Sequence, residues 1–238
     1  MSKVYAIRRG RIIGKVYSWD ECLDATKGYP SAEYKSFKTE VEADAYLRGE
    51  ELNNAVDNSG KMIKIAKPVS KDVANLFCDG GFKEDKYSFG IYLECANNDY
   101  LSCGTFKDVD WVSTGSRNIV GECIGCLAGL QLAGSLGYKR INIYYDYEGL
   151  AKWINGDFEA KSEIAIRYVA TFNQIIQKYG LGYRFFYTKG HSGVRGNELA
   201  DKLSTRARKQ NIEASAETVW RLQYSVNNAQ LQNPRLFL

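Results

Sequence analysis

Runs of apolar residues separated by short polar turns mark the middle of the chain. Residues 72–81, 88–96 and 100–106 are rich in aliphatic and aromatic residues, and they predict three consecutive antiparallel strands. Apolar residues at helical spacing then predict a helix over 118–137. Two further strands are expected at 141–146 and 182–190, with helices at 148–156, 162–180 and 196–209. The order βββαβααβα indicates a mixed α/β fold with a five-stranded sheet flanked by helices over residues 72–208.

A second, smaller unit is predicted before this region. Two short strands at 4–10 and 11–18, a third within 29–39, and helices at 18–28 and 39–49 give a small α/β domain with a three-stranded sheet over residues 1–48. Thr39 with Glu42 three residues later is the capping-box pattern for the second helix. Residues 49–71 show no sustained periodicity and are interpreted as a linker. Residues 209–238 are interpreted as a tail to which we assign no role.

Composition narrows the class of protein. The chain has 238 residues, of which 45% are hydrophobic and 25% charged, as is ordinary for a globular protein. Its net charge of +4 is too small to prove a polyanionic partner by itself. No run of eighteen apolar residues occurs, and residues 1–15 lack the apolar core of a signal peptide, so we expect a cytoplasmic protein without a membrane partner. We also expect a monomer.

The six cysteines do not form a recognisable metal site. Cys123 and Cys126 make a CxxC pair, but no second pair of ligands follows at a spacing suited to zinc. We therefore expect small buried thiols on a helix. The chain is also too large and hydrophobic to need a disulfide framework.

Four acidic residues stand where a hydrophobic core would not require them. Asp79 and Asp146 follow apolar strands, and the carboxyl ends of neighbouring parallel strands open into a crevice where ligands usually bind. Glu122 lies in the first turn of its helix, where a charge–dipole contact alone would account for it. Asp201 points about 145° away from the apolar face of the last helix, since each residue turns about 100°. Taken singly, each acid is more often a solvated side chain than a ligand.

Convergence of these acids would imply bound cations. Four neighbouring carboxylates repel one another strongly when ionised, and divalent ions would cancel that charge. Hard oxygen ligands suit Mg²⁺ or Mn²⁺, and two such ions can clamp the attacking and leaving oxygens of a phosphodiester displacement. His191 is the single histidine, so a Ser-His-Asp or Cys-His site would have to use it. It lies in the glycine-containing stretch 189–196, where it has little packing to do, which favours proton shuttling.

The motifs CDGG, NIVGE at 118–122, YYDYEG and KGHSGVRGNELAD resemble, in this order, those of the type 1 ribonuclease H domain. The resemblance covers residues 72–208 and implies a ribonuclease H-like fold. It also implies a two-metal endonuclease that cleaves the RNA strand of RNA–DNA hybrids, leaving 3′-hydroxyl and 5′-phosphate ends. Two Mg²⁺ ions, replaceable by Mn²⁺, would be the cofactors, and the hybrid the partner. The implied metal ligands are Asp79, Glu122, Asp146 and Asp201. The resemblance assigns proton transfer or product release to His191 and a minor-groove contact to Asn118.

Residues 3–48 resemble the hybrid-binding domain found at the front of eukaryotic and some bacterial ribonucleases H, and in viral inclusion proteins. Trp19, Tyr34 and Lys35 match its nucleic-acid-contacting aromatics and lysine, while Ser36 stands where close relatives carry a second lysine. A ring against sugars with lysine on phosphate is plausible chemistry for the DNA strand. Residues 1–15 hold five basic residues and no acid, which is a local patch suited to phosphates. The residues predicted to bind the hybrid in this unit are Tyr5, Arg8, Arg9, Trp19, Tyr34 and Lys35.

Several alternatives stay open at this point. Trp19 could instead be a core residue, since small folds need large side chains. The basic handle of some ribonucleases H is missing between Trp153 and Tyr179, and Trp153 itself is more consistent with packing than with a DNA contact. A catalytically silent nucleic-acid-binding module is the main alternative function, although all four acids and the histidine are present. An assembly role like that of a viral inclusion protein would rest on the first fifty residues alone.

Overall fold

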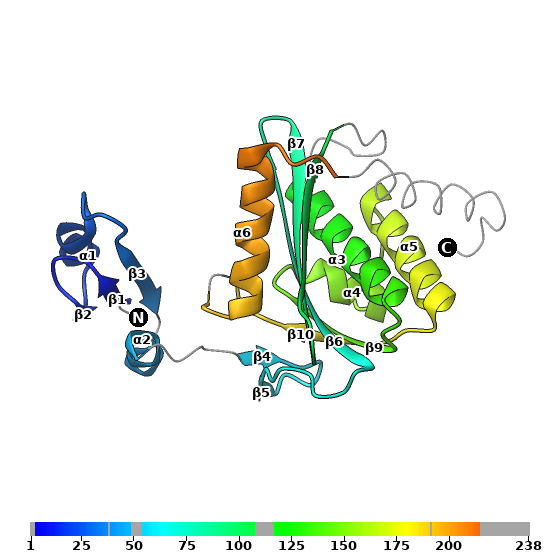
Figure 1. The fold of residues 1–238 in the computed structure, drawn as a ribbon, viewed down its shortest axis with the longest axis horizontal. Coiled ribbons are helices and arrows are strands. Elements are labelled where there is room, and N and C mark those ends of the chain that lie inside the picture. The colour runs from blue at the N-terminus through cyan, green and yellow to red at the C-terminus, as the bar shows by residue number, and fades with distance from the viewer. Residues whose placement is uncertain (1–2, 38, 49–53, 108–116, 191, 215–238) are drawn as a thin grey trace. The chain divides into compact units, whose positions relative to one another are not determined.

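The computed structural model describes the chain except for residues 1–2, 38, 49–53, 108–116, 191 and 215–238 (Figure 1). The chain divides into two compact units, of which the first contains residues 1–53 and the second contains residues 54–190 and 196–238, and each unit is described by itself.

The first unit is a three-stranded antiparallel sheet with strand order β2-β1-β3 and two helices. Buried side chains on the two faces of β1 form separate small cores, one around Ile7 and Cys22 of α1 and one around Ala6 and Ala43 of α2. The helices α1 and α2 therefore cover opposite faces of the sheet. The elements are β1 (Val4–Arg9), β2 (Gly14–Val16), α1 (Trp19–Thr26), β3 (Glu33–Phe37) and α2 (Glu40–Leu47).

Both helices of this unit begin with a capping box. Thr39 accepts a hydrogen bond from the Glu42 backbone N–H, and the Glu42 carboxylate accepts one from the Thr39 N–H, which confirms the predicted helix start. Ser18 and Glu21 make the same reciprocal pair at the start of α1. Each box satisfies backbone donors that the first helical turn leaves unpaired.

The second unit is a seven-stranded mixed sheet with strand order β5-β4-β10-β9-β6-β7-β8. In Figure 1 the helices α3, α4 and α5 cover one face of this sheet and α6 covers the other. The strands are β4 (Asn54–Val56), β5 (Met62–Lys64), β6 (Val73–Lys83), β7 (Lys86–Cys95), β8 (Tyr100–Phe106), β9 (Arg140–Tyr145) and β10 (Gly182–Tyr187). The helices are α3 (Arg117–Ser135), α4 (Gly149–Asn155), α5 (Glu163–Tyr179) and α6 (Arg195–Gln210).

The mixed α/β fold with its central meander is confirmed, but the sheet has two strands more than the five expected. The additional hairpin, β4 and β5, lies in the region 49–71 that we interpreted as a linker, and it pairs with β10 through Val56 and Tyr187. Each of its strands has three residues, which is too short to show an alternating pattern. Asp57 organises its turn by accepting hydrogen bonds from the Ser59 and Lys61 backbone N–H groups.

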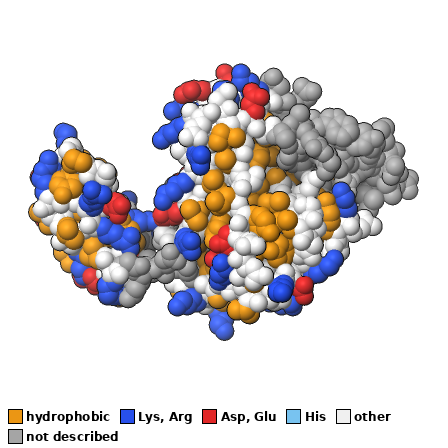
Figure 2. Space-filling model, viewed as in Figure 1, with side chains coloured by type: hydrophobic (Ala, Val, Ile, Leu, Met, Phe, Trp, Pro, Cys, Tyr) orange, Lys and Arg blue, Asp and Glu red, His pale blue; other side chains and the backbone are white. Residues whose placement is uncertain are grey.

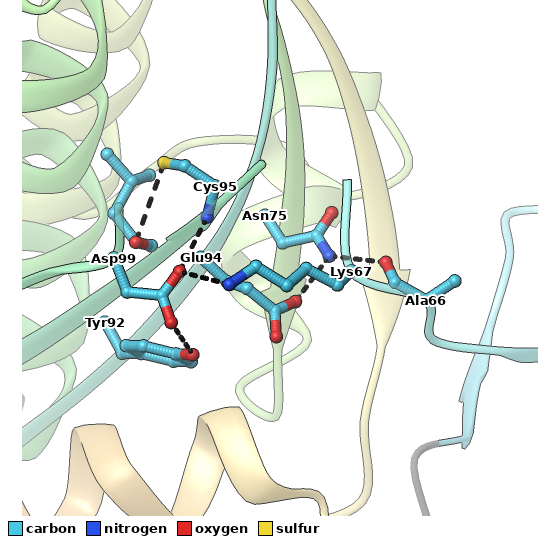
Figure 3. A network of polar contacts seen from close by, with 8 residues as sticks. Ala66, Lys67, Asn75, Tyr92, Glu94, Cys95 and Asp99 are labelled. Atoms are coloured by element: carbon cyan, nitrogen blue, oxygen red, sulfur yellow. Dashed lines mark hydrogen bonds and ion pairs between the residues drawn. The ribbon is translucent and has the colours of Figure 1, made fainter. Parts of the chain in front are cut away.

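A polar network fastens the segment after this hairpin to the sheet (Figure 3). The buried Asn75 side chain on β6 donates to the Ala66 carbonyl at 3.0 Å and to the Glu94 carboxylate at 2.9 Å. Lys67 forms an ion pair with Asp99 at 3.2 Å. The residues that lead from β5 into β6 therefore belong to the body of the second unit.

The main hydrophobic core lies between the sheet and the helices α3 and α5. All six cysteines are free thiols, and five of them, including Cys123 and Cys126, are buried, as expected for packing residues. In the part of the chain that the structure describes, no helix is long and apolar enough to cross a membrane.

The chain after α6 returns to the edge of the sheet. Thr105 of β8 donates its backbone N–H to the Ile212 carbonyl at 2.7 Å, and the Ala214 N–H donates to the Thr105 carbonyl at 2.8 Å. The first residues of the region interpreted as a tail thus complete α6 and then pair with β8. Residues 215–238 lie outside the described residues.

Candidate active site and nucleic-acid interface

Asp79 and Asp146 stand at equivalent positions of two neighbouring parallel strands. The register of β6 and β9 ends with Phe77 opposite Tyr144, and each aspartate lies two residues further along its own chain. Because side chains alternate between the faces of a sheet, the two carboxylates project from the same face as this last pair. Both side chains are half-buried. The expectation that these acids lie side by side agrees with this register.

Two glycines bring Glu122 against the same strand. A Cβ atom on Gly80 would lie 2.0 Å from the Glu122 backbone nitrogen, and one on Gly121 would lie 2.6 Å from the Gly81 nitrogen. Only residues without side chains allow the first turns of α3 to approach β6 this closely. The Gly80 backbone N–H also lowers the pKa of the Glu122 carboxylate, against the burial that raises it.

A third glycine places Asp201. Gly90 on β7 is the registered partner of Asp79, and a Cβ atom there would lie 2.1 Å from the Ala200 carbonyl oxygen. The helix α6 therefore crosses β7 at its backbone, and Asp201 follows Ala200 directly. Asp201 is half-buried and close enough to Asp79 for their charges to interact.

The charges of the neighbouring acids act on Asp79 and Glu122. Burial, with the nearby charges of Asp201 and Asp146, raises the pKa of Asp79 to about 7, and a hydrogen bond from Ser204 opposes that rise. Burial, with the charges of Asp79 and Asp146, raises the pKa of Glu122 well above its usual range. Asp79 and Glu122 are thus harder to ionise because the neighbouring carboxylates are present.

The donor set fits hard divalent cations. The Oε2 atom of Glu122 is buried without a hydrogen-bond partner, and a buried anionic oxygen without a partner is costly. Carboxylates that repel one another would be neutralised by ions such as Mg²⁺. Among the described residues, however, no three acidic, histidine or cysteine side chains already surround one point closely enough to hold an ion. The carboxylates would have to draw together on binding.

The remaining residues predicted for this unit have different positions. Asn118 is exposed in the first turn of α3, four residues before Glu122. His191 lies outside the described residues. Trp153 packs edge-on against Tyr147, with ring centroids 5.7 Å apart, and tilted against Tyr168 at 6.2 Å, which agrees with its interpretation as a packing residue.

In the first unit, three predicted aromatic residues form one cluster. The ring of Trp19 lies 5.8 Å from that of Tyr5 and 6.1 Å from that of Tyr34. Trp19 is 47% exposed and Tyr34 is 42% exposed, so Trp19 is not a core residue of this small fold. Figure 2 shows hydrophobic side chains exposed among lysines and arginines on the visible face of this unit.

Arg8 and Lys35 lie on the other face of the same sheet. Lys35 pairs in register with Ala6, which belongs to the core under α2, whereas Tyr34 pairs with Ile7 on the α1 face. The Arg8 guanidinium lies 4.0 Å from the centre of the Tyr46 ring and donates to the Tyr46 carbonyl at 2.6 Å. The aromatic and the basic residues matched to the hybrid-binding pattern are therefore divided between two faces, while Arg9 is exposed near the end of β1.

The basic patch at residues 1–15 is partly engaged within the unit itself. Arg11 donates to the carbonyls of Asp24 and Lys27 at the end of α1, which leaves fewer unpaired helix carbonyls. Lys15 pairs with Glu40 at 2.9 Å and Asp44 at 2.8 Å on α2. The sequence pattern could not show these partners, because they come from later elements.

The residues that bring the acids together were not predicted from the sequence. A glycine inside an apolar strand, such as Gly90, is a sequence signal for close approach of another backbone, and Gly121 beside Glu122 is a similar signal. Ser88, Ser204 and Arg208 carry no such signal, because a serine or arginine within a strand or helix is unremarkable.

Comparison with known families decides the relationship. The profile of the reverse transcriptase-like family matches residues 77–207, more than half of the chain, and spans all four acids. The chain belongs to this family. A second profile, described as the ribonuclease H1 N-terminal domain, matches residues 3–47. The predicted membership among type 1 ribonucleases H with such an N-terminal domain is therefore confirmed, and so is the enzyme class, a ribonuclease H hydrolase.

Relatives named ribonuclease H1 match most of the chain. The chain is 24% identical over 264 residues to ribonuclease H1 of Homo sapiens, covering 87% of this chain and 89% of that protein. Ribonuclease H1 of Mus musculus is also 24% identical, over 256 residues with the same coverage. Ribonuclease H of Crithidia fasciculata is 37% identical over 57 residues, which are 24% of this chain and 12% of that protein.

Solved structures of ribonucleases H1 align with part of the chain. The enzyme of Halobacterium salinarum aligns with a TM-score of 0.49 and 15% identity, covering 58% of this chain and 98% of its own. The structure of LC11-RNase H1 in complex with an RNA/DNA hybrid aligns with a TM-score of 0.47 and 15% identity, covering 57% of this chain and 99% of its own.

Proposed function

We propose that this chain hydrolyses the RNA strand of RNA–DNA hybrids with two divalent cations and leaves 3′-hydroxyl and 5′-phosphate ends. The observation that carries the proposal is the set of half-buried carboxylates at Asp79, Glu122, Asp146 and Asp201, in which Glu122 Oε2 has no partner and the ionisation of Asp79 is opposed by its neighbours. The relatives named ribonuclease H1, which match most of the chain in both units, support hybrids as the substrate.

Each acid has a proposed task. Asp79 and Asp146, at equivalent positions of β6 and β9, would hold the ions on one side, and Glu122 and Asp201 would complete the ligand set from α3 and α6. Bound divalent ions would supply Lewis-acid activation of the attacking water and neutralise the departing oxygen. Mg²⁺ is the ion proposed, with Mn²⁺ as a substitute, because both prefer carboxylate oxygens.

The chemistry of the proposed cleavage fixes the product ends. Water attacks the phosphorus atom, a new P–O bond forms, and the bond from phosphorus to the 3′-oxygen of the upstream nucleotide breaks. The phosphate stays on the 5′ side of the downstream fragment, and the 3′-oxygen takes up a proton to give a hydroxyl. His191, the single histidine, is proposed to handle this proton or to assist product release.

Substrate contacts are proposed for both units. Asn118, exposed beside the acids in the first turn of α3, would contact the minor groove of the hybrid. In the first unit, Tyr5, Trp19 and Tyr34 would stack against sugars or bases, and Arg8, Arg9 and Lys35 would contribute positive charge. A binding unit joined to a catalytic unit raises the local concentration of substrate without changing the chemistry.

A cleavage assay on a labelled hybrid tests this proposal. Full-length protein should cut the RNA strand with Mg²⁺, be silent with chelator, and leave double-stranded DNA and RNA intact. Asp146→Asn should abolish cleavage but retain hybrid binding, measured by fluorescence anisotropy in chelator. The matched control Asp157→Asn removes an exposed carboxylate outside the site and should cleave normally.

The products identify the end chemistry. Phosphatase treatment should change the electrophoretic mobility of the downstream fragment, because that fragment carries the 5′-phosphate. Retained cleavage by Asp146→Asn would remove the two-metal proposal, and binding without any cleavage by the unmodified chain would favour the silent binding module.

A further inference from the structure

A buried polar chain lies behind Asp79 on the side of α6. Ser88 on β7 and Ser204 on α6 are fully buried, and their hydroxyl oxygens are 2.9 Å apart. Alanine would fill either position without bringing a polar group into the interior. A buried hydroxyl lowers the stability of the folded chain unless it is hydrogen-bonded. The further hydrogen-bond partners of Ser88 and Ser204 therefore matter for the fold.

Arg208, one helical turn beyond Ser204, supplies positive charge to both hydroxyls. Its Nη1 donates to Ser88 Oγ at 2.6 Å and to Ser204 Oγ at 3.2 Å, while Nη2 donates to Thr205 at 3.1 Å. A Cβ atom on Gly81 would lie 2.2 Å from Arg208 Nη1, so the guanidinium occupies the space that this glycine leaves open. The second glycine of the DGG motif thus makes room for the arginine.

The donors and acceptors set the direction of this chain. A guanidinium can only donate, so Ser204 Oγ accepts from Arg208. The hydroxyl proton of Ser204 has two possible acceptors, Ser88 Oγ at 2.9 Å and the Asp79 carboxylate, whose pKa Ser204 lowers. The carboxylate carries the negative charge and is the stronger acceptor. With that proton directed to Asp79, Ser88 is the donor in its contact with Ser204, in place of its longer contact of 3.5 Å with the Gly81 carbonyl. The hydrogen bonds therefore run from Arg208 to Ser204 and from Ser204 to Asp79, with each donor directed toward the carboxylate.

We propose that Ser204 and Arg208, with Ser88, are positioning residues that orient the Asp79 carboxylate for metal binding. The hydrogen bond from Ser204 restrains the carboxylate from the α6 side, so that its remaining acceptor capacity faces Asp146 and Asp201. This inference rests on the proposed function, because it assigns a task to residues behind one of its ligands. Partners of this kind commonly change metal affinity or activity 10–100-fold when they are removed.

The test compares variants of the full-length chain. Ser204→Ala removes the donor to Asp79 without adding volume, and Arg208→Ala removes the charge behind it. Arg206→Ala is the matched control, since Arg206 is exposed on the same helix and donates to Gln210 at 2.9 Å. The direct readout is Mn²⁺ affinity of the protein without substrate, measured by electron paramagnetic resonance of the unbound ion.

Ser204→Ala should weaken Mn²⁺ binding about tenfold, and Arg208→Ala severalfold, while Arg206→Ala should bind as the unmodified chain does. In cleavage assays, the Mg²⁺ concentration for half-maximal rate should rise for the first two variants, with the KM for the hybrid unchanged. A general loss of structure would instead change the KM and the melting temperature as well.

The double variant Ser204→Ala with Arg208→Ala decides whether the arginine acts through the serine. If it does, the double variant should lose no more Mn²⁺ affinity than Ser204→Ala alone. Fully multiplicative losses would overturn the chain, as would Ser204→Ala with unchanged Mn²⁺ affinity in a protein whose unmodified form binds Mn²⁺ and cleaves. An unmodified chain that neither binds Mn²⁺ nor cleaves would instead contradict the proposed function.

Discussion

Gly90 on β7 lies directly opposite Asp79 on β6, and the backbone of α6 fills the space where a side chain at Gly90 would be. The same residue that pairs with one acid therefore admits the helix that carries another, Asp201. Because Gly90 has no Cβ, the α6 backbone can lie close to β7, and Asp201 can therefore lie close to Asp79.

Gly90→Ala should reduce both stability and cleavage. The new Cβ would lie 2.1 Å from the Ala200 carbonyl oxygen and 2.6 Å from the Ser204 nitrogen, so α6 must shift. Overpacking of this kind costs about 1–3 kcal/mol of unfolding free energy. Gly182→Ala is the control, because its Cβ would meet Arg140 at an ordinary 3.6 Å. Equal melting temperatures and cleavage rates for the two variants would contradict this account.

The stability of the metal-free chain should fall as the pH rises from about 4 to about 7. The pKa of Asp79 in the folded chain is raised to about 7, above the value of about 3.9 in an unfolded chain. Between these values the folded state binds more protons, so each such group lowers stability by up to about 1.4 kcal/mol per pH unit. The raised pKa of Glu122 acts in the same direction.

Asp79→Asn should therefore stabilise the metal-free protein at pH 7.5 and have little effect near pH 4. Calorimetric unfolding in chelator at both pH values would measure the difference. An equal change in melting temperature at the two pH values would mean that ionisation of Asp79 is not the cause.

Mg²⁺ should raise the melting temperature of the second unit more at pH 7.5 than at pH 5. Bound ions favour the ionised carboxylates, and a ligand at a hundred times its Kd stabilises the folded state by about 2.7 kcal/mol. Asp146→Asn, which lacks one proposed ligand, should show a smaller increase. A Mg²⁺ effect of the same size in both proteins would place the ions elsewhere.

Trp19→Ala should weaken hybrid binding more than it weakens turnover at saturating substrate. Trp19 is 47% exposed between Tyr5 and Tyr34, and loss of one stacking ring costs about 1–3 kcal/mol, or roughly 5- to 150-fold in affinity. Tyr29→Ala removes another partly exposed ring of the same unit and serves as the control. Unchanged affinity of Trp19→Ala, measured by anisotropy, would remove this cluster from the interface.

The parts of this structure that could be read from the sequence are those with a local signal. The strands of the meander, the capping box at Thr39 and Asp146 after β9 each follow from residues close together in the chain. Asp79 was expected to follow its strand but lies within β6, which continues to Lys83 because it stays paired with β7. The β4–β5 hairpin was missed because three-residue strands show no periodicity. The contacts of Ser204 with Ser88, 116 residues away, depend on how α6 crosses the sheet, which no local pattern encodes.

The hairpin also shortens the connection between the two units. Since α2 ends at Leu47 and β4 begins at Asn54, six residues rather than some twenty join one folded body to the other. A chain of that length spans at most roughly 20–25 Å. Insertion of residues into this connection is therefore a direct way to lower the effective concentration of one unit with respect to the other.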